Sequence, residues 1–181
     1  MRRQTLVVLG AVAMSVMLVF AAVAVAETIK GTQGDDSPLN GTPDDDKIVA
    51  KKGDDDVFAL AGNDVVNAGR GADTADGDVG DDTLKGKKGS DELTGEGGAD
   101  NLSGKDGGDT LDGGDDADSL NGGKGADNID GGLGNDTIKS KGDGNTADTV
   151  NCGPGDDVVS ADKNDVVNAD CETVKQSGPK P

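Results

Sequence analysis

The chain has 181 residues, with 36 acidic against 17 basic side chains and a formal net charge of −19. It contains no Trp, Tyr or His and only two Phe, so a core built on aromatic side chains is excluded. The absence of His excludes Ser–His and Cys–His catalysis, and the acidic excess disfavours nucleic acid and anionic lipid as partners. Composition alone leaves open an acidic, largely disordered chain that holds cations or mineral loosely.

The first residues have the pattern of a secretory signal peptide. Arg2 and Arg3 precede an apolar stretch from Leu6 to Val25, which ends in the small residues Ala24-Val25-Ala26. This pattern predicts cleavage after Ala26, so that residues 1–26 are removed and the protein is secreted, extracellular and free of the membrane. The apolar stretch, roughly 20 residues, is also long enough for an uncleaved membrane anchor.

A nine-residue period dominates the middle of the chain. Aspartate recurs at this spacing without a break, at Asp46, Asp55, Asp64, Asp73, Asp82, Asp91, Asp100, Asp109, Asp118, Asp127 and Asp136. An aliphatic residue stands two positions after each of them, from Ile48 to Ile138, and Gly stands two positions before all except two. A fixed period of this kind is typical of solenoids, in which each unit buries its apolar side chain by stacking on its neighbours.

Two of the units match a known motif completely. Residues 122–130 read GGKGADNID and residues 131–139 read GGLGNDTIK. Both fit G-G-x-G-x-D-x-U-x, with U a large aliphatic residue, which is the calcium-binding repeat of RTX proteins. Over roughly residues 41–168 the chain therefore resembles the RTX family. The resemblance implies an all-β fold, a parallel β-roll (β-solenoid) of stacked Gly/Asp-rich repeats with two repeats per coil, and several Ca²⁺ ions as cofactor.

The resemblance also implies where the ions bind, because in that family Asp carboxylates and turn carbonyls from successive coils share each ion. With two repeats per coil, alternate Asp residues fall on the same edge, one series starting at Asp46 and the other at Asp55. Coils stack about 4.8 Å apart, so the carboxylates of one edge repel each other unless cations lie between them. Ca²⁺ prefers such oxygen ligands, and we expect calcium binding to be coupled to folding.

The predicted ligands concentrate in the later repeats. The main set is Asp82, Asp91, Asp100, Asp109, Asp118, Asp127 and Asp136, with Gly95, Gly98, Gly104, Gly107, Gly113, Gly122, Gly125, Gly131 and Gly134 in the turns. Weaker ligands are expected at Asp46, Asp55, Asp64, Asp73 and Asp157. The early turns are expected to be weaker because Ala50, Ala59 and Ala68 replace the first Gly, and a Cβ at positive φ costs about 1 kcal/mol or more.

The period changes after Ile138. The Asp-x-Val pattern resumes at Asp148 and Asp157, and then recurs one residue early at Asp165. Cys152 and Cys171 flank this part. Two Cys in an exported chain are expected to pair, although a reduced pair without a role is the alternative. The region resembles the terminal segment of secreted RTX-repeat proteins, which indicates a disulfide-stapled cap.

The sequence predicts four parts and a binding rather than a catalytic function. Residues 1–26 form the signal peptide, 27–140 the calcium-binding β-roll, 141–175 its continuation and disulfide-stapled cap, and 176–181 a disordered tail. We expect calcium ions as partners, no nucleic acid, and a structural or adhesive role at a surface, with any cell-surface or matrix partner left open. We expect no enzyme activity, because the repeats account for every Asp pair.

Overall fold

The computed structural model describes residues 26–142 and 146–177, and these ranges are built from strands and turns. The predicted signal peptide lies outside the described residues apart from Ala26, as do residues 178–181 of the predicted tail. Within these ranges, no helix is long and apolar enough to cross a membrane.

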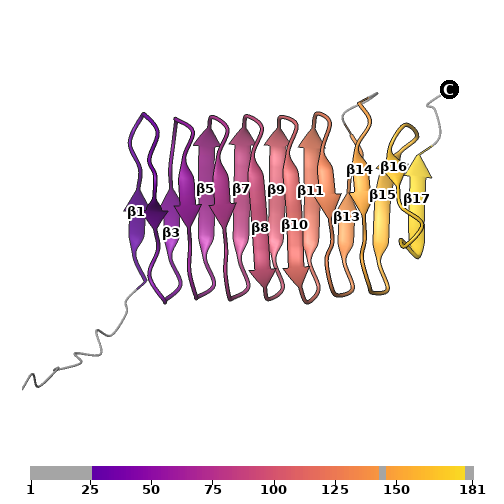
Figure 1. The fold of residues 1–181 in the computed structure, drawn as a ribbon, viewed down its shortest axis with the longest axis horizontal. Helices are drawn as coiled ribbons and strands as arrows, with labels where there is room; N and C mark the ends of the chain where they lie inside the picture. The colour runs from indigo at the N-terminus through magenta and orange to yellow at the C-terminus, as the bar shows by residue number, and fades with distance from the viewer. Residues whose placement is uncertain (1–25, 143–145, 178–181) are drawn as a thin grey trace, which may run out of the picture.

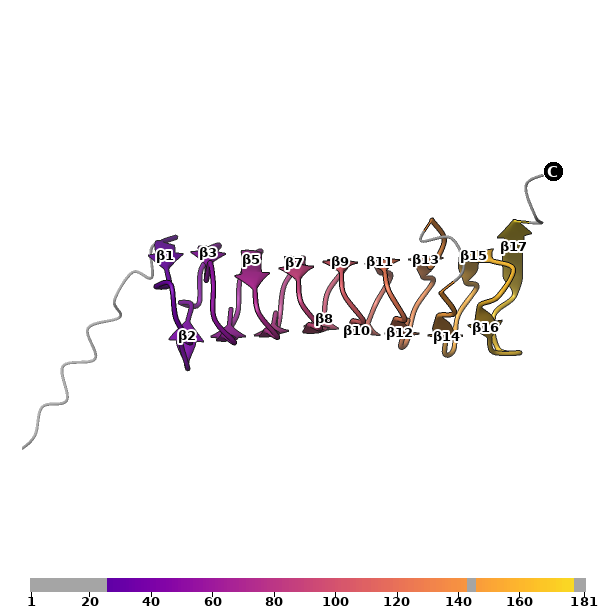
Figure 2. The same ribbon diagram turned by 90° about the horizontal axis from the view of Figure 1, so that it is seen from above.

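The strands form two parallel sheets that face each other along the whole roll (Figures 1 and 2). Sheet A contains β1 (Thr28–Lys30), β3 (Lys47–Val49), β5 (Val65–Arg70), β7 (Thr83–Lys88), β9 (Asn101–Asp106), β11 (Ser119–Lys124), β13 (Thr137–Lys139), β15 (Val158–Asp162) and β17 (Thr173–Ser177). Sheet B contains β2 (Leu39–Asn40), β4 (Asp56–Phe58), β6 (Thr74–Asp76), β8 (Glu92–Gly97), β10 (Thr110–Asp115), β12 (Asn128–Asp130), β14 (Thr149–Asn151) and β16 (Val166–Val167).

The chain alternates between the two sheets, so two consecutive strands make one coil. Leu84 of β7 pairs with Leu102 of β9, and Leu102 pairs with Leu120 of β11, while Leu93 of β8 pairs with Leu111 of β10. Equivalent positions of successive coils therefore stack directly. This confirms the predicted β-roll with two repeats per coil.

The core is a thin ladder of stacked aliphatic side chains between the two sheets. Its fully buried members include Ile48, Val57, Val66, Leu84, Leu93, Leu102, Leu111, Leu120, Ile129, Ile138, Val150 and Val159. Burial of one such side chain stabilises the fold by about 1.5–3 kcal/mol. This gain is opposed by the loss of conformational entropy when the nine backbone residues of the unit become ordered. The aliphatic ladder is therefore not enough to stabilise the roll, and further interactions in the turns are required.

The expected strain at Ala50, Ala59 and Ala68 is wrong. None of the three is among the residues with positive φ, and all three are buried inside the coil. Positive φ occurs instead at the second and fourth positions of the turns. The second position accepts side chains, as at Lys51 (φ 93°) and Leu60 (φ 74°), and does so in later repeats as well. The side chain at the first position points inward, so its size is limited by the space in the core.

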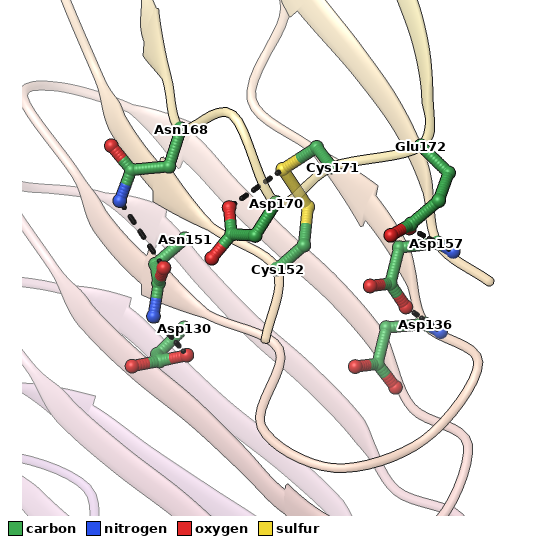
Figure 3. The surroundings of a disulfide bond; sticks show 9 residues. All are labelled: Asp130, Asp136, Asn151, Cys152, Asp157, Asn168, Asp170, Cys171 and Glu172. Atoms are coloured by element: carbon green, nitrogen blue, oxygen red, sulfur yellow. Dashed lines mark hydrogen bonds between the residues drawn. A yellow bond between two sulfur atoms is a disulfide. The ribbon is translucent and has the colours of Figure 1, made fainter. Parts of the chain in front are cut away.

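The C-terminal coils carry the predicted disulfide (Figure 3). Cys152 and Cys171 are joined, and they tie the turn after β14 to the segment that leads into β17. Cys152 is fully buried at the inward first position of its turn. Beside the disulfide, the Asn151 side chain donates a hydrogen bond of 2.9 Å to Asp130 and accepts one of 3.1 Å from Asn168.

Replacing both cysteines with Ser should loosen the last coils and leave the centre of the roll intact. A disulfide closing a loop of this size contributes about 3 kcal/mol, mostly by restricting the unfolded chain. Ser fits the inward position, because Ser140 already occupies an equivalent one. Native-state hydrogen exchange in calcium should show lost protection in β14–β17 and unchanged protection in β7–β11. Equal protection of β14–β17 in both proteins would contradict a stapling role.

Candidate metal centres

Two rows of buried aspartates run along the edges of the roll. The backbone N–H of each row aspartate donates to the Oδ1 of the Asp one coil further on, as from Asp82 to Asp100 at 2.7 Å and from Asp91 to Asp109 at 2.9 Å. The coil is 18 residues long up to Asp136 and 21 residues long from Asp136 to Asp157. The first row contains Asp46, Asp64, Asp82, Asp100, Asp118, Asp136 and Asp157. The second row contains Asp55, Asp73, Asp91, Asp109 and Asp127. The rows lie as the nine-residue spacing predicts.

The rows extend beyond the residues predicted as ligands. Asp36 donates its N–H to Asp55 at 2.8 Å and begins the second row, which continues through Asp148 and Asp165. The first row ends at Glu172, whose Oε2 accepts the Asp157 N–H at 3.0 Å (Figure 3). Asp148 and Asp165 show the Asp-x-Val signal, but the altered spacing hides their place in the row. Glu172 could not be found from the repeat, because it is not an Asp and does not stand at the repeat spacing.

The second carboxylate oxygen of these residues is the unusual feature of the rows. It is buried and accepts no hydrogen bond at Asp55, Asp64, Asp73, Asp82, Asp91, Asp100, Asp109, Asp118, Asp136 and Asp157. At the N-terminal end of the first row the protein supplies the missing donors, because Asp46 Oδ2 accepts the Thr42 N–H at 2.6 Å and its hydroxyl at 2.9 Å. A buried carboxylate oxygen without a partner is costly, so the inner members require a cation or a proton.

The first-position glycines make room for these oxygens. A Cβ added at Gly95 would collide with Asp100 Oδ2, and one added at Gly104 would collide with Asp109 Oδ2. The same contact between Gly and the Asp five residues later recurs at Gly77, Gly86, Gly113, Gly122 and Gly131. The predicted ligands Gly95, Gly104, Gly113, Gly122 and Gly131 therefore lie directly against a row carboxylate.

The fourth-position glycines place backbone oxygens between the coils. A Cβ added at Gly107 would collide with the carbonyl oxygen of Gly89, and one added at Gly125 with that of Gly107. These carbonyls therefore point along the roll toward the next coil. Gly98, Gly107, Gly125 and Gly134 adopt φ values of 130°, 155°, 125° and 141°. Carbonyl and carboxylate oxygens together form the donor set that a hard cation prefers.

The rows do not form a cage of side chains. In the described parts of the chain, no three acidic or other metal-ligating side chains converge on one point. Successive carboxylates of a row lie one coil apart, and the turn carbonyls lie beside them. A cation held here would take one or two carboxylate oxygens and draw its other ligands from turn carbonyls and water, as Ca²⁺ does with six to eight oxygens.

Comparison with known proteins assigns the repeat. A family model described as RTX calcium-binding nonapeptide repeat (4 copies) matches residues 40–75, 76–111 and 103–138, which together make more than half of the chain. The chain belongs to the RTX calcium-binding nonapeptide-repeat family. No curated protein matches the chain. The repeats of this family bind Ca²⁺, and the orphaned oxygens of the two aspartate rows fit that cation.

The acidity of the RTX row carboxylates reflects their burial. Burial raises the pKa of Asp82, Asp91 and Asp118 to about 7, with further contributions from carboxylates of neighbouring coils. It raises the pKa of Asp64, Asp73, Asp100 and Asp109 to about 6, although a backbone N–H opposes the shift at each. Burial also acts on Asp46, but hydrogen bonds from Glu27 and Thr42 bring its pKa below the usual value.

In EDTA, the metal-free RTX roll should gain β-structure as the pH falls from 8 to 5. A carboxyl whose pKa is raised to about 6 or 7 on folding binds a proton more tightly in the folded state. Its stabilising effect is complete below the unfolded pKa of about 4 and is lost as the pH rises through the folded pKa. Far-UV circular dichroism against pH measures this. A β signal that falls steadily with acidification would contradict the buried rows.

Proposed function

We propose that this RTX protein is an extracellular calcium-binding module that folds when it binds calcium and then serves as a structural or adhesive element at a surface. The observation that carries the proposal is the set of buried Asp Oδ2 atoms without hydrogen-bond donors in both rows. Each lies in a turn whose carbonyls face the next coil, so a Ca²⁺ ion between coils would meet several oxygen ligands at once.

Coupling between folding and calcium follows from the repulsion within the rows. The Asp82 N–H donates to the Asp100 carboxylate of the next coil, and burial together with the charges of Asp100 and Asp64 raises the pKa of Asp82. Without a cation at neutral pH, the folded chain must hold a series of such carboxylates in its interior. The thin ladder of aliphatic side chains contributes too little free energy to offset the cost of these buried charges. Calcium removes the repulsion only in the folded arrangement, so it stabilises that arrangement.

The extracellular location rests on two features. Residues 1–26 have the signal-peptide pattern, and the Cys152–Cys171 disulfide suits an oxidising compartment. Calcium is abundant outside cells and scarce inside them, so a chain of this kind would stay loose during export and fold afterwards. Sequencing the N-terminus of the secreted protein tests this directly. A mature protein that begins at Glu27 supports the proposal, and one that keeps Met1 or residues 1–26 contradicts it.

The proposed role is ion binding without catalysis. The row carboxylates are buried in the stacked turns, and each is tied by Oδ1 to the coil before it. That arrangement suits fixed ions rather than a group that exchanges protons with a substrate. The alternative, an acidic and largely disordered chain that holds cations or mineral loosely, predicts a different response to calcium.

Circular dichroism of residues 27–181 separates the two. In EDTA at neutral pH the spectrum should be that of a disordered chain, and calcium should convert it cooperatively to β-structure. Magnesium serves as the control, because it requires stricter octahedral geometry and should fail at equal concentration. A chain that stays disordered at millimolar calcium would overturn the proposal and leave the loose acidic polymer.

A further inference from the structure

The basic side chains of the roll gather on one of its two sides, where they outnumber the surface acids, which include Asp54 and Asp106. Every Lys and Arg in residues 26–142 and 146–177 lies on a strand of sheet A or in the turn that leaves one. We call the last residues of the sheet A strands, together with the turns that follow them, the basic edge. It carries Lys51, Lys52, Arg70, Lys87, Lys88, Lys105 and Lys124. We call the last residues of the sheet B strands, together with the turns that follow them, the acidic edge. It carries Asp78, Glu96, Asp115 and Asp116, all exposed.

The basic edge stacks like charges on one another. Lys87 pairs in register with Lys105 of the next coil, and Lys88 pairs with Arg70 of the coil before. Like charges directly opposite each other on neighbouring strands are destabilising. The ion pair that does form on this edge joins Lys124 and Asp106 at 2.7 Å, between side chains that are 73 % and 48 % exposed. The chain has abundant carboxylates, so this column is not explained by a shortage of internal partners.

The acidic edge has a second feature, which is exposed aliphatic side chains. Val79 and Leu133 stand at the tips of its turns and are 62 % and 52 % exposed. They lie in the same column as Asp115, which is bridged to Leu133 of the next coil. At these exposed positions the two apolar side chains bury little surface within the roll and so do little to stabilise it. The aliphatic stems of Lys and Arg are suited to cover them while their charged ends meet the carboxylates.

We infer that the basic edge of one roll docks on the acidic edge of a second copy of this chain. Both edges repeat with the coil, at about 4.8 Å, so their charge columns have the same period in every copy. Several opposite charges therefore meet at once, and Val79 and Leu133 are covered in the same contact. The two edges lie on opposite sides of the flattened coil (Figure 1), so the contact is head-to-tail and continues into a raft of parallel rolls.

This inference requires a folded roll and goes beyond calcium binding. The net charge of −19 opposes close approach of two copies, so the local complementarity of the edges must outweigh it. The contact should therefore weaken as salt rises, because screening shortens the range of the edge charges to about 3 Å at 1 M. Two charge-reversal variants distinguish a contact between edges from an effect of net charge.

Lys87→Glu with Lys105→Glu reverses the basic edge, and Asp78→Lys with Glu96→Lys reverses the acidic edge. The backbone tolerates both, because these second positions all have positive φ, between 68° at Asp78 and 91° at Lys87, and already hold Lys in some turns and Glu in another. Lys47→Glu with Lys139→Glu is the matched control, since it makes the same charge change on the flat outer face of sheet A.

Sedimentation velocity in calcium at low salt measures the association, with circular dichroism of each sample to confirm the fold. The parent chain and the control should associate as concentration rises, and each reversed variant should need at least about tenfold more protein. The acidic-edge variant should associate more weakly although it makes the net charge less negative. Mixing the two reversed variants should restore association. A parent chain that stays monomeric overturns the inference. So does an acidic-edge variant that associates as well as the parent, or a mixture that stays apart.

Discussion

Replacing Asp109 with Asn should have opposite effects with and without calcium. Asn keeps an oxygen to accept the Asp91 N–H, which Oδ1 now accepts at 2.9 Å, but it removes the buried negative charge. Burial raises the pKa of Asp109 to about 6, so the ionised group disfavours the metal-free fold at neutral pH. In EDTA the variant should therefore retain more β-structure than the parent chain. In calcium it should need at least about tenfold more ion to fold, because ligand charge sets the affinity of such sites.

The control for this prediction is Asp115→Asn, which makes the same change in charge at an exposed position. It should change neither the calcium midpoint nor the metal-free spectrum. Calcium titrations followed by circular dichroism measure all three proteins. If Asp109→Asn folds at the parent's calcium concentration, then Asp109 is not a calcium ligand. If it loses β-structure in EDTA, the buried charge is not what keeps the metal-free chain unfolded.

The sequence predicts the arrangement of this protein well because one period governs both its core and its turns. Asp64 and Asp82 stand two repeats apart, and an 18-residue coil places them on the same edge, where a hydrogen bond of 2.7 Å joins them. The aliphatic two positions later then has to stack on its equivalent, as Val66 does on Leu84. The resemblance to the RTX family supplies the β-roll with two repeats per coil, and the register and the order of the rows then follow from the nine-residue spacing.

The ends of the rows follow from tertiary contacts and cannot be predicted from spacing. Glu172 completes the first row only 15 residues after Asp157, because the chain cuts its last coil short before β17. Thr42 satisfies Asp46 through its N–H and hydroxyl, a local hydrogen-bond pattern that no repeat consensus contains. At the N-terminal end, the protein's own groups satisfy a second carboxylate oxygen of the kind that the inner coils leave for a cation.

The glycines show why residue type alone misleads about the early turns. The repeated Gly positions predict positive φ throughout the turn, and hence strain at Ala50. The structure separates two reasons for Gly. The first position is Gly in later turns because an Asp oxygen occupies the space of a Cβ, and the fourth is Gly because of both φ and the carbonyl of the preceding coil. Only the backbone path distinguishes these, and the weakness of the early sites stays a prediction.

Gly98→Ala and Gly97→Ala should differ sharply although the two residues are adjacent in one turn. Gly98 has φ 130°, and an added Cβ would collide with the carbonyl oxygen of Gly80, a backbone atom that cannot turn aside. A side chain in this region costs about 1–3 kcal/mol before the collision is counted. Gly97 has no heavy atom within 4 Å of an added Cβ, so Ala there should be neutral or stabilise by up to about 1 kcal/mol.

Urea unfolding of both variants in saturating calcium measures the difference. We expect Gly98→Ala to lower the free energy of unfolding by at least about 2 kcal/mol, because the turn must move away from the coil before it. The same movement would pull the Gly80 and Gly98 carbonyls out of the gap between coils, so the calcium midpoint should rise as well. Gly97→Ala should leave both quantities unchanged or slightly improved. Equal behaviour of the two variants would mean that the coils do not stack as closely as the carbonyl contact between Gly80 and Gly98 requires.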